Sequence, residues 1–314
     1  MSKTRPRTTW IPGLIATTLA AGAITAGIST DASALNGDPA ADGSYAFTAK
    51  ITIGDQGRAC SGALVDPYWV VTAASCFADN PAQSTAVPAG APAQKTTVTV
   101  GHTDLTTATG SALEAVELVP RQDRDLVMVR LAKPATGITP LAVGATAPSQ
   151  GGTLTVAGYG RTKTEWVPNK LHAAAFTIGK TAATGIDIAP QAPADAAICK
   201  GDTGGPALHK TSTGYELVAV NSRSWQGGCL GSSETRTGAY DTRTDDIAPW
   251  IEDIRKRRAK ADITAMYNGG QTGTGKNITA LFQFANNGNG DFKTPVKAWD
   301  NDDNVNSSWD WNRA

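Results

Sequence analysis

Short apolar runs separated by turn-forming residues occupy most of the chain between Leu35 and Thr244. Each run has the length of one β-strand, and Gly, Pro, Asp and Asn stand between the runs, as in the Asp66-Pro67 turn. Runs at this spacing, without helical patterns between them, indicate antiparallel barrels or sandwiches. We expect strands at Phe47–Ile53, Ala59–Val65, Tyr68–Ala73, Thr96–His102, Leu113–Val119, Leu126–Leu131, Leu154–Tyr159, Leu171–Ile178, Ile186–Ala189, Pro206–His209, Leu217–Asn221 and Ala239–Arg243.

One helical pattern follows the last of these runs and extends from Asp245 to about Arg258. Its apolar residues recur at i, i+3, i+4 and i+7, which predicts a single buried stripe. Thr244 is expected to cap the first turn, and the acidic start and basic end of the segment match the helix dipole. The basic end, Arg255–Arg258, is interpreted as a solvated last turn rather than a nucleic-acid patch. The stripe consists of Ile247, Trp250, Ile251 and Ile254.

The first 34 residues have the pattern of a signal peptide. A basic start with Lys3, Arg5 and Arg7 precedes an apolar stretch from Trp10 to Ile28, and Ala32-Ser33-Ala34 offers a small-residue cleavage site. The alternative is a transmembrane anchor, which the threonines and glycines of the stretch disfavour. We therefore predict a secreted, extracellular protein that has no membrane association after cleavage.

Composition excludes several classes of protein. Apolar residues make up 40% of the chain, and 8 Trp, 6 Tyr and 6 Phe are enough for a packed core, which disfavours a wholly disordered chain. The 28 basic residues balance 28 acidic ones, which leaves no electrostatic basis for nucleic-acid binding. We expect a monomer without cofactors.

The chain has four cysteines, at positions that contain no CxxC pair. An even number in an exported chain favours two disulfides, and the absence of a CxxC pair argues against a zinc site. Three connectivities remain open on this ground alone. The cysteines are Cys60, Cys76, Cys199 and Cys229.

A glycine-rich turn, Gly201–Pro206, carries the clearest sign of chemistry. A hydroxyl residue between glycines on a tight turn exposes its oxygen, and the N–H groups of Gly201 and Thr203 are placed to form an oxyanion site. A second segment upstream, Cys60–Leu64 followed by Trp69–Cys76, supports this interpretation.

These motifs, in this order, resemble the trypsin-like serine proteases of the chymotrypsin fold, of the type secreted by actinobacteria. The resemblance extends from about Leu35 to Arg258, which we take as the protease domain. It implies an all-β fold of two six-stranded antiparallel β-barrels with a C-terminal helix, and the disulfides Cys60–Cys76 and Cys199–Cys229. It rests on Thr72-Ala73-Ala74-x-Cys76, Asp125-Leu126, Gly201–Pro206, Ser224-Trp225, Gly238-Ala239-Tyr240 and the helix that contains Trp250.

Two of the three catalytic positions that the resemblance assigns depart from the family pattern. The aspartate is present as Asp125, but Ser75 stands at the position of the histidine base and Thr203 at that of the serine nucleophile. Imidazole takes a proton near neutral pH, whereas a serine hydroxyl has no basicity in that range. Threonine proteases use their own N-terminal amine as base, and Thr203 is internal.

No other side chain is expected to replace the missing base. The chain has three histidines, His102, His172 and His209, and each is placed by the strand pattern as a surface or structural residue. Lys200 lies beside the loop, but an exposed ammonium with a pKa near 10.4 is a poor base. No spacing of the histidines supports a metal site.

The resemblance also places a specificity pocket and a supporting ion pair. The pocket positions are Ala197, where trypsin itself has an aspartate, and Ser224, Trp225, Gln226 and Gly238. Gln226 stands where a glycine usually keeps the entrance open, and its side chain either narrows the entrance or turns outward.

The family's supporting ion pair is formed by the new N-terminus that cleavage releases. Cleavage after Ala34 would make Leu35 that terminus. Its amine is expected to pair with Asp202 and to order the oxyanion loop.

Residues 259–314 form a tail rich in Gly, Asn and Asp, with β-prone segments at Asn277–Phe284 and Val296–Trp299. Part of it, from about Asp262, resembles the start of an FG-GAP (VCBS-like) repeat. The runs Asn287–Asp291 and Asp300–Asn304 have alternating oxygen ligands, but both lack the glycine of a calcium loop and are interpreted as turns.

The sequence therefore predicts a secreted protease homologue with little or no proteolytic activity, whose cleft binds a peptide, a protein or a protease inhibitor. One alternative is an active endopeptidase that uses Thr203 as nucleophile. The other is a surface-binding module that acts through the tail.

Overall fold

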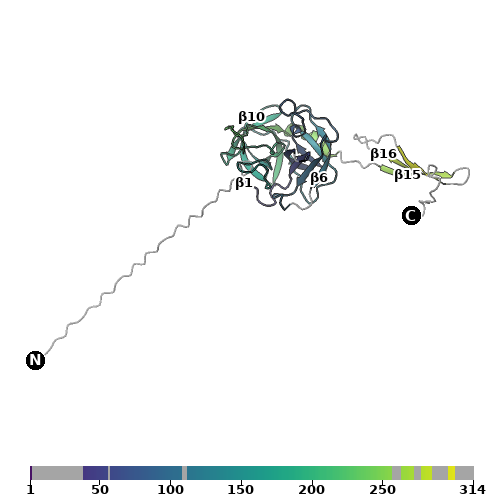
Figure 1. The fold of residues 1–314 in the computed structure, drawn as a ribbon, viewed down its shortest axis with the longest axis horizontal. Coiled ribbons are helices and arrows are strands. Elements are labelled where there is room, and N and C mark those ends of the chain that lie inside the picture. The colour runs from purple at the N-terminus through teal and green to yellow at the C-terminus, as the bar shows by residue number, and fades with distance from the viewer. Residues whose placement is uncertain are drawn as a thin grey trace. The chain divides into compact units, whose positions relative to one another are not determined.

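The computed structural model describes Met1 and residues 38–55, 57–107, 112–256, 263–271, 277–284 and 296–300. The chain divides into two units, Met1–Asp31 and Ala32–Ala314, and the elements below belong to the second (Figure 1). The predicted signal peptide, apart from Met1, and Leu35 lie outside the described residues.

Six antiparallel strands form a first closed barrel in the order β2-β3-β4-β7-β6-β5. Its core contains Ile51, Leu64, Trp69 and Met128, all 0–1% exposed, because inward positions of these strands are apolar. The strands are β2 (Thr48–Ile53), β3 (Arg58–Asp66), β4 (Trp69–Thr72), β5 (Thr96–Val100), β6 (Ala112–Pro120) and β7 (Val127–Leu131).

A second barrel follows, in which β9-β10-β11-β14-β13-β12 closes through pairing of β12 with β9. Phe176 and Ile186 are among its fully buried side chains. Two short strands extend this sheet: β1 (Asp38–Pro39) pairs with β10, and β8 (Ala142–Val143) pairs with β13. The barrel strands are β9 (Thr153–Gly158), β10 (His172–Thr181), β11 (Gly185–Ala192), β12 (Pro206–Lys210), β13 (Tyr215–Ser224) and β14 (Ala239–Arg243).

The architecture and the disulfides implied by the resemblance are confirmed. Each strand expected between residues 47 and 243 overlaps one of the twelve barrel strands. Cys60 is bonded to Cys76 and Cys199 to Cys229, with Cα–Cα distances of 6.2 and 5.7 Å. The first disulfide joins β3 to the 3₁₀ turn that contains Ser75. The second joins the residue two positions before Gly201 to the segment that follows β13.

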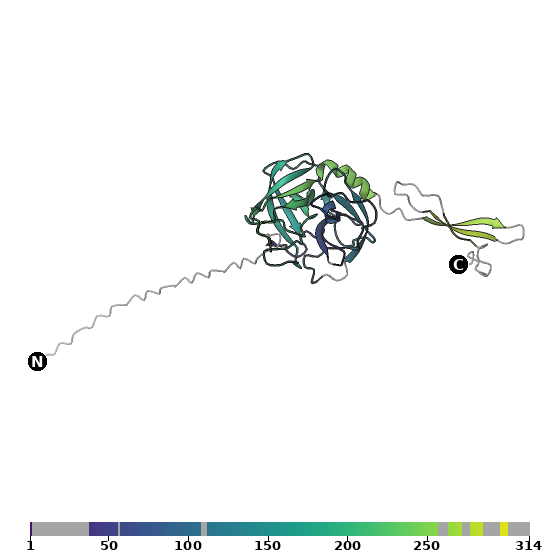
Figure 2. The same ribbon diagram turned by 45° about the horizontal axis from the view of Figure 1, so that its top comes forward.

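The expected helix begins as a 3₁₀ turn (Asp245–Ile247) and continues as α1 (Ala248–Lys256). Ile251 and Ile254 belong to the core cluster of the first barrel, against which α1 packs (Figure 2). The prediction that Thr244 caps the helix is wrong, because its hydroxyl donates to the Leu217 carbonyl at 3.4 Å instead. Trp250 is only half-buried, and the Arg121 guanidinium lies 5.1 Å from its ring centroid.

The tail contains a three-stranded antiparallel sheet of β15 (Ile263–Gln271), β16 (Asn277–Phe284) and β17 (Val296–Asp300). The expected strands coincide with β16 and β17, whereas β15 was not expected. The Asn287–Asp291 run lies outside the described residues, as does all of the Asp300–Asn304 run except Asp300. Among the residues that the structure describes, no helix is long and apolar enough to cross a membrane.

Candidate active-site cleft

A cleft of about 730 Å³ brings together the three positions that correspond to a catalytic triad. Ser75 and Asp125 reach it from the first barrel, and Thr203 reaches it from the second. The cleft therefore lies between residues of the two barrels.

Asp125 is held by hydrogen bonds to both of its oxygens. The Ser75 amide donates to Oδ1 at 2.7 Å, and the Ser75 hydroxyl donates to Oδ2 at 2.8 Å. Ser222, on β13, donates its hydroxyl to Oδ2 at 2.7 Å. The alcohol of Ser75 thus occupies the place beside Asp125, and its hydroxyl proton is directed to the aspartate rather than to Thr203.

Ser222 is a site residue that sequence reasoning missed. The motif comparison used Ser224-Trp225, two residues further along, whereas the serine that contacts Asp125 is Ser222. The sequence did offer a signal, because Ser222 follows an apolar run and stands at a position that is expected to be buried. A buried serine needs a polar partner, and in the structure that partner is Asp125.

The Gly201–Pro206 loop is hydrogen-bonded to strand β3 through Ser61. Ser61 donates its hydroxyl to the Gly201 carbonyl and its amide to the Thr203 carbonyl, both at 2.9 Å. Gly204 has φ +85°, and a Cβ there would collide with Thr72 and Ser61. Within the described part of the chain, no hydrogen bond uses the N–H of Gly201 or of Thr203, or the Thr203 hydroxyl. These two amides are consequently available to an oxygen bound in the cleft.

Asp202 is fully buried behind this loop. Its carboxylate accepts hydrogen bonds from the amides of Gly160 at 2.7 Å and Cys199 at 2.9 Å. Burial raises its pKa to about 7, although the two amide donors act in the opposite direction. Its expected partner, the amine of Leu35, lies outside the described residues.

None of the three histidines lines this cleft. His172 is buried and its Nδ1 lies 2.9 Å from the Lys170 carbonyl, while the exposed His209 contacts Glu216. His102 has a buried Nε2 that makes no hydrogen bond to any described residue. Lys200 lines the cleft and is exposed. Among the described residues no group of histidine, cysteine and acidic side chains is arranged to hold a metal ion.

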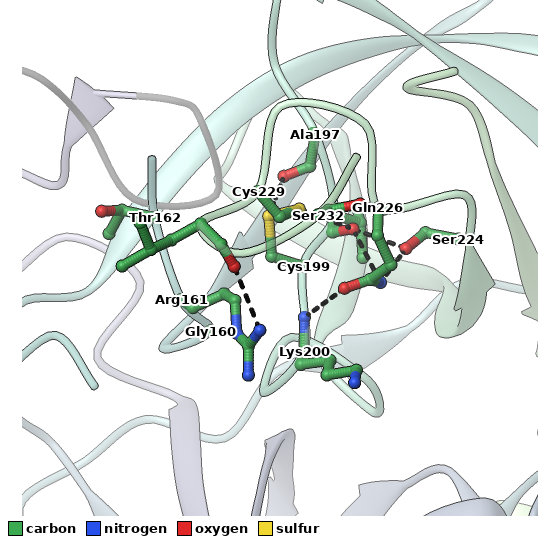
Figure 3. Close-up of a disulfide and its surroundings, with 12 residues drawn as sticks. Gly160, Arg161, Thr162, Ala197, Cys199, Lys200, Ser224, Gln226, Cys229 and Ser232 are labelled. Atoms are coloured by element: carbon green, nitrogen blue, oxygen red, sulfur yellow. Dashed lines mark hydrogen bonds between the residues drawn. A yellow bond between two sulfur atoms is a disulfide. The ribbon is translucent and has the colours of Figure 1, made fainter. Parts of the chain in front are cut away.

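Gln226 and Ser224 connect the two sides of the expected specificity pocket (Figure 3). The Gln226 Oε1 accepts from the Lys200 amide at 2.9 Å, and its Nε2 donates to the Ile198 carbonyl at 3.4 Å and contacts the Ser224 hydroxyl. That hydroxyl donates to Ile198 at 2.5 Å. Gln226 has φ +68°, a backbone conformation that favours glycine. The Gln226 amide is thus hydrogen-bonded to the Ile198–Lys200 segment.

The other expected pocket residues do not line the cleft itself. Ala197 is buried beside Cys199 and Cys229 and does not line the cleft. Trp225 and Gly238 line a second cavity of about 290 Å³, which also includes Tyr240 and shares Arg223 and Ser224 with the cleft. The structure therefore groups Ser224 and Gln226 with the catalytic positions, places Trp225 and Gly238 in the adjoining cavity, and leaves Ala197 out of both.

Comparison with known proteins agrees with this geometry. A family model described as Trypsin matches residues 34–251. The chain belongs to the trypsin family. Similar proteins include a trypsin-like protease of Streptomyces glaucescens, 28% identical over 74% of this chain and 85% of that protein. Another is the snake venom serine protease Haly-2 of Gloydius brevicauda, 27% identical over 63% of this chain and 78% of its own length.

A third similar protein, the human hepatocyte growth factor activator serine protease, is 28% identical over 70% of this chain and 36% of that protein. Identities of this size leave the residues at individual catalytic positions to be judged from the chain itself. For this trypsin-family member, these are the positions of Ser75, Asp125 and Thr203.

Proposed function

We propose that this chain is a trypsin-family protein with little or no proteolytic activity, and that its cleft binds a peptide or a protein. One observation carries the proposal. The hydroxyl of Ser75 donates to Asp125 at 2.8 Å, in the place where the family's mechanism needs a base. Trypsin-like proteases in general bind peptide substrates or protein inhibitors, and the cleft is the surface on which this chain retains that capacity.

The chemistry of acyl transfer explains why this replacement matters. The nucleophile's proton must go to a group that accepts it near neutral pH, and an imidazole does so because its pKa is near 6.5. A serine hydroxyl cannot take that proton, and Asp125 is already engaged by Ser75 and Ser222. Loss of one triad member costs on the order of a million-fold in turnover, or about 8 kcal/mol of transition-state stabilisation.

The remaining catalytic features support an alternative, a slow endopeptidase that uses Thr203. The Thr203 hydroxyl makes no hydrogen bond to any described residue, and the amides of Gly201 and Thr203 are available as oxyanion donors. This arrangement stabilises a tetrahedral intermediate but does not activate the nucleophile.

The proposal for the mature protein also includes secretion, a monomeric state and no cofactor. The surface-binding alternative concerns the tail and stays a prediction.

Hydrolysis by the purified secreted chain tests the proposal. The protein is incubated with casein and with a library of internally quenched peptides, alongside Thr203→Ala purified in the same way. We expect equal background release from both. Turnover that disappears in Thr203→Ala would establish the endopeptidase and overturn the proposal.

A further inference from the structure

The residues that line the cleft carry more basic than acidic side chains, although the whole chain is balanced. The whole chain is formally neutral, with 28 basic and 28 acidic residues. The described residues that line the cleft include one carboxylate, Asp125, and both of its oxygens are engaged by Ser75 and Ser222. The basic side chains that line it are Arg58, Arg161, Lys200 and Arg223.

None of these four cations forms an ion pair within the described part of the chain. Elsewhere arginines are commonly matched, as Arg124 is by Asp246 and Arg243 by Asp245. Unmatched cations that face one cavity with low-polarity walls attract an anionic ligand. The pattern thus distinguishes the cleft from the surface around it.

Three of the four cations are also held in place. The Arg161 guanidinium lies 4.5 Å from the Trp166 ring centroid, and that of Arg223 lies 4.3 Å from the Tyr240 ring centroid. Arg223 also lines the second cavity, together with Tyr240 and Asp187. Arg58 donates through Nη1 to the carbonyl of Cys76 at 2.9 Å. The Arg58 Nη1 also donates to the Ala78 carbonyl at 2.6 Å, and the Arg161 Nη1 donates to the Leu230 carbonyl at 3.1 Å. The Nη2 group of each guanidinium makes no hydrogen bond to a described residue and can donate to a carboxylate.

The apolar part of the cleft rim favours a peptide as the anion. Trp166 and Val167 line the cleft and are 59% and 66% exposed. A volume of about 730 Å³ holds a few residues of an extended chain and is too small for a nucleic-acid duplex. Gln226 and Ser224 are hydrogen-bonded to Lys200 and Ile198 on the opposite wall of the specificity pocket. A ligand is therefore expected to lie along the cleft without inserting a side chain into that pocket.

We propose that the cleft selects an acidic peptide segment, whose carboxylates pair with Arg58, Arg161, Lys200 and Arg223. The proposal rests on the proposed function, because it names the class of ligand for the same cleft. It goes further because it assigns recognition of the peptide to these four cations rather than to the specificity pocket.

Fluorescence anisotropy with labelled nine-residue peptides tests the proposal on the purified Thr203→Ala chain, which cannot cleave them through Thr203. One peptide alternates glutamate with alanine, and a second has glutamine in place of each glutamate. We expect the glutamate peptide to bind at least about tenfold more tightly, and 0.5 M salt to weaken it. Lys200→Glu and Arg223→Glu should each weaken it about tenfold, whereas Lys210→Glu, an exposed control outside the cleft, should not.

Each outcome separates this inference from the proposed function. Equal binding of the two peptides, or no effect of Lys200→Glu and Arg223→Glu, would overturn the acidic preference while leaving a non-hydrolytic binding protein. Tighter binding of a twelve-nucleotide oligothymidylate than of the glutamate peptide would also overturn the proposal of an acidic peptide ligand. Cleavage of these peptides by the unmodified chain, but not by Thr203→Ala, would overturn the proposed function and leave the preference to be judged from the binding data.

Discussion

At the scale of single residues, the central feature is a polar network that is complete without a histidine. Asp125 receives donors from Ser75 and Ser222, so its buried side is satisfied. The second feature is Gln226, whose left-handed backbone and amide contacts join Ile198 and Lys200. A non-glycine residue in that conformation persists because the surrounding contacts hold it there.

Rebuilding the triad tests whether these two features limit activity separately. We expect the double variant Ser75→His, Thr203→Ser to gain slow hydrolysis of small ester substrates, because it restores a base and a nucleophile. Adding Gln226→Gly should raise kcat/KM by about tenfold or more, since it removes the side-chain amide that is hydrogen-bonded to Ile198 and Lys200 in the specificity pocket. Gln226→Gly alone is the control and should gain nothing. A triple variant no faster than the double variant would show that Gln226 does not obstruct substrate.

These two features also mark what sequence reasoning could and could not reach. The replacement at Ser75 was evident because the family motif around Cys76 is local in sequence. The orientation of Gln226 depends on the Ile198 carbonyl and the Lys200 amide, which are distant in sequence, so both orientations remained open until the fold was known. The contact of Ser222 with Asp125 has the same long-range character.

At the scale of elements, β14 has a buried carboxyl group, that of Asp241. Asp241 lies opposite Asn221 of β13, and both of its carboxylate oxygens lack a hydrogen-bond partner among the described residues. Burial raises its pKa to about 8. The folded barrel therefore prefers the protonated form, and ionisation of this residue opposes folding.

Replacing Asp241 by Asn should stabilise the protein, and more at high pH than at low pH. The folded-state pKa is above the unfolded value of 3.8, so the folded state holds the proton more tightly, and its stability decreases as pH rises from about 4 to about 8. Asn keeps the shape of the neutral form and removes this loss. Melting temperatures of both proteins at pH 5 and pH 8 measure the effect.

Asp187→Asn, at an exposed position on β11, is the matched control and should leave the difference between pH 5 and pH 8 unchanged. A gain from Asp241→Asn that is equal at both pH values would show that ionisation of Asp241 is not the cause.

At the scale of the whole molecule, the twelve barrel strands followed from sequence because each had a local apolar pattern, whereas their arrangement in two barrels was implied by the resemblance to the trypsin family. The pattern could not show β1 and β8, since two residues carry no period. It also could not show that Thr244 turns to the Leu217 carbonyl, because that partner belongs to another strand.

Blocking the N-terminal amine should make stability more dependent on pH. Asp202 has a pKa raised to about 7 by burial, so without a cationic partner the fold loses stability as pH rises from about 4 to about 7. A Leu35 amine paired with Asp202 would keep the carboxylate ionised and offset this loss. We expect a chain that begins with acetylated Leu35 to melt at a lower temperature than the free chain at pH 7.5, with a smaller difference at pH 4.5.

Asp202→Asn provides the control for this comparison, because it has no charge to neutralise. In that variant, acetylation should not change the melting temperature at either pH. A free chain and an acetylated chain with the same pH dependence would contradict the pairing.

The central claim is that no group in the cleft activates Thr203. Labelling with a fluorophosphonate tests it most directly, because this reagent reacts only with an activated hydroxyl and its adduct is read by intact mass and peptide mapping. With an active trypsin-family protease as positive control in the same reaction, we expect no mass increase for this chain. An adduct mapped to Thr203 would show that the hydroxyl is activated and would contradict the account.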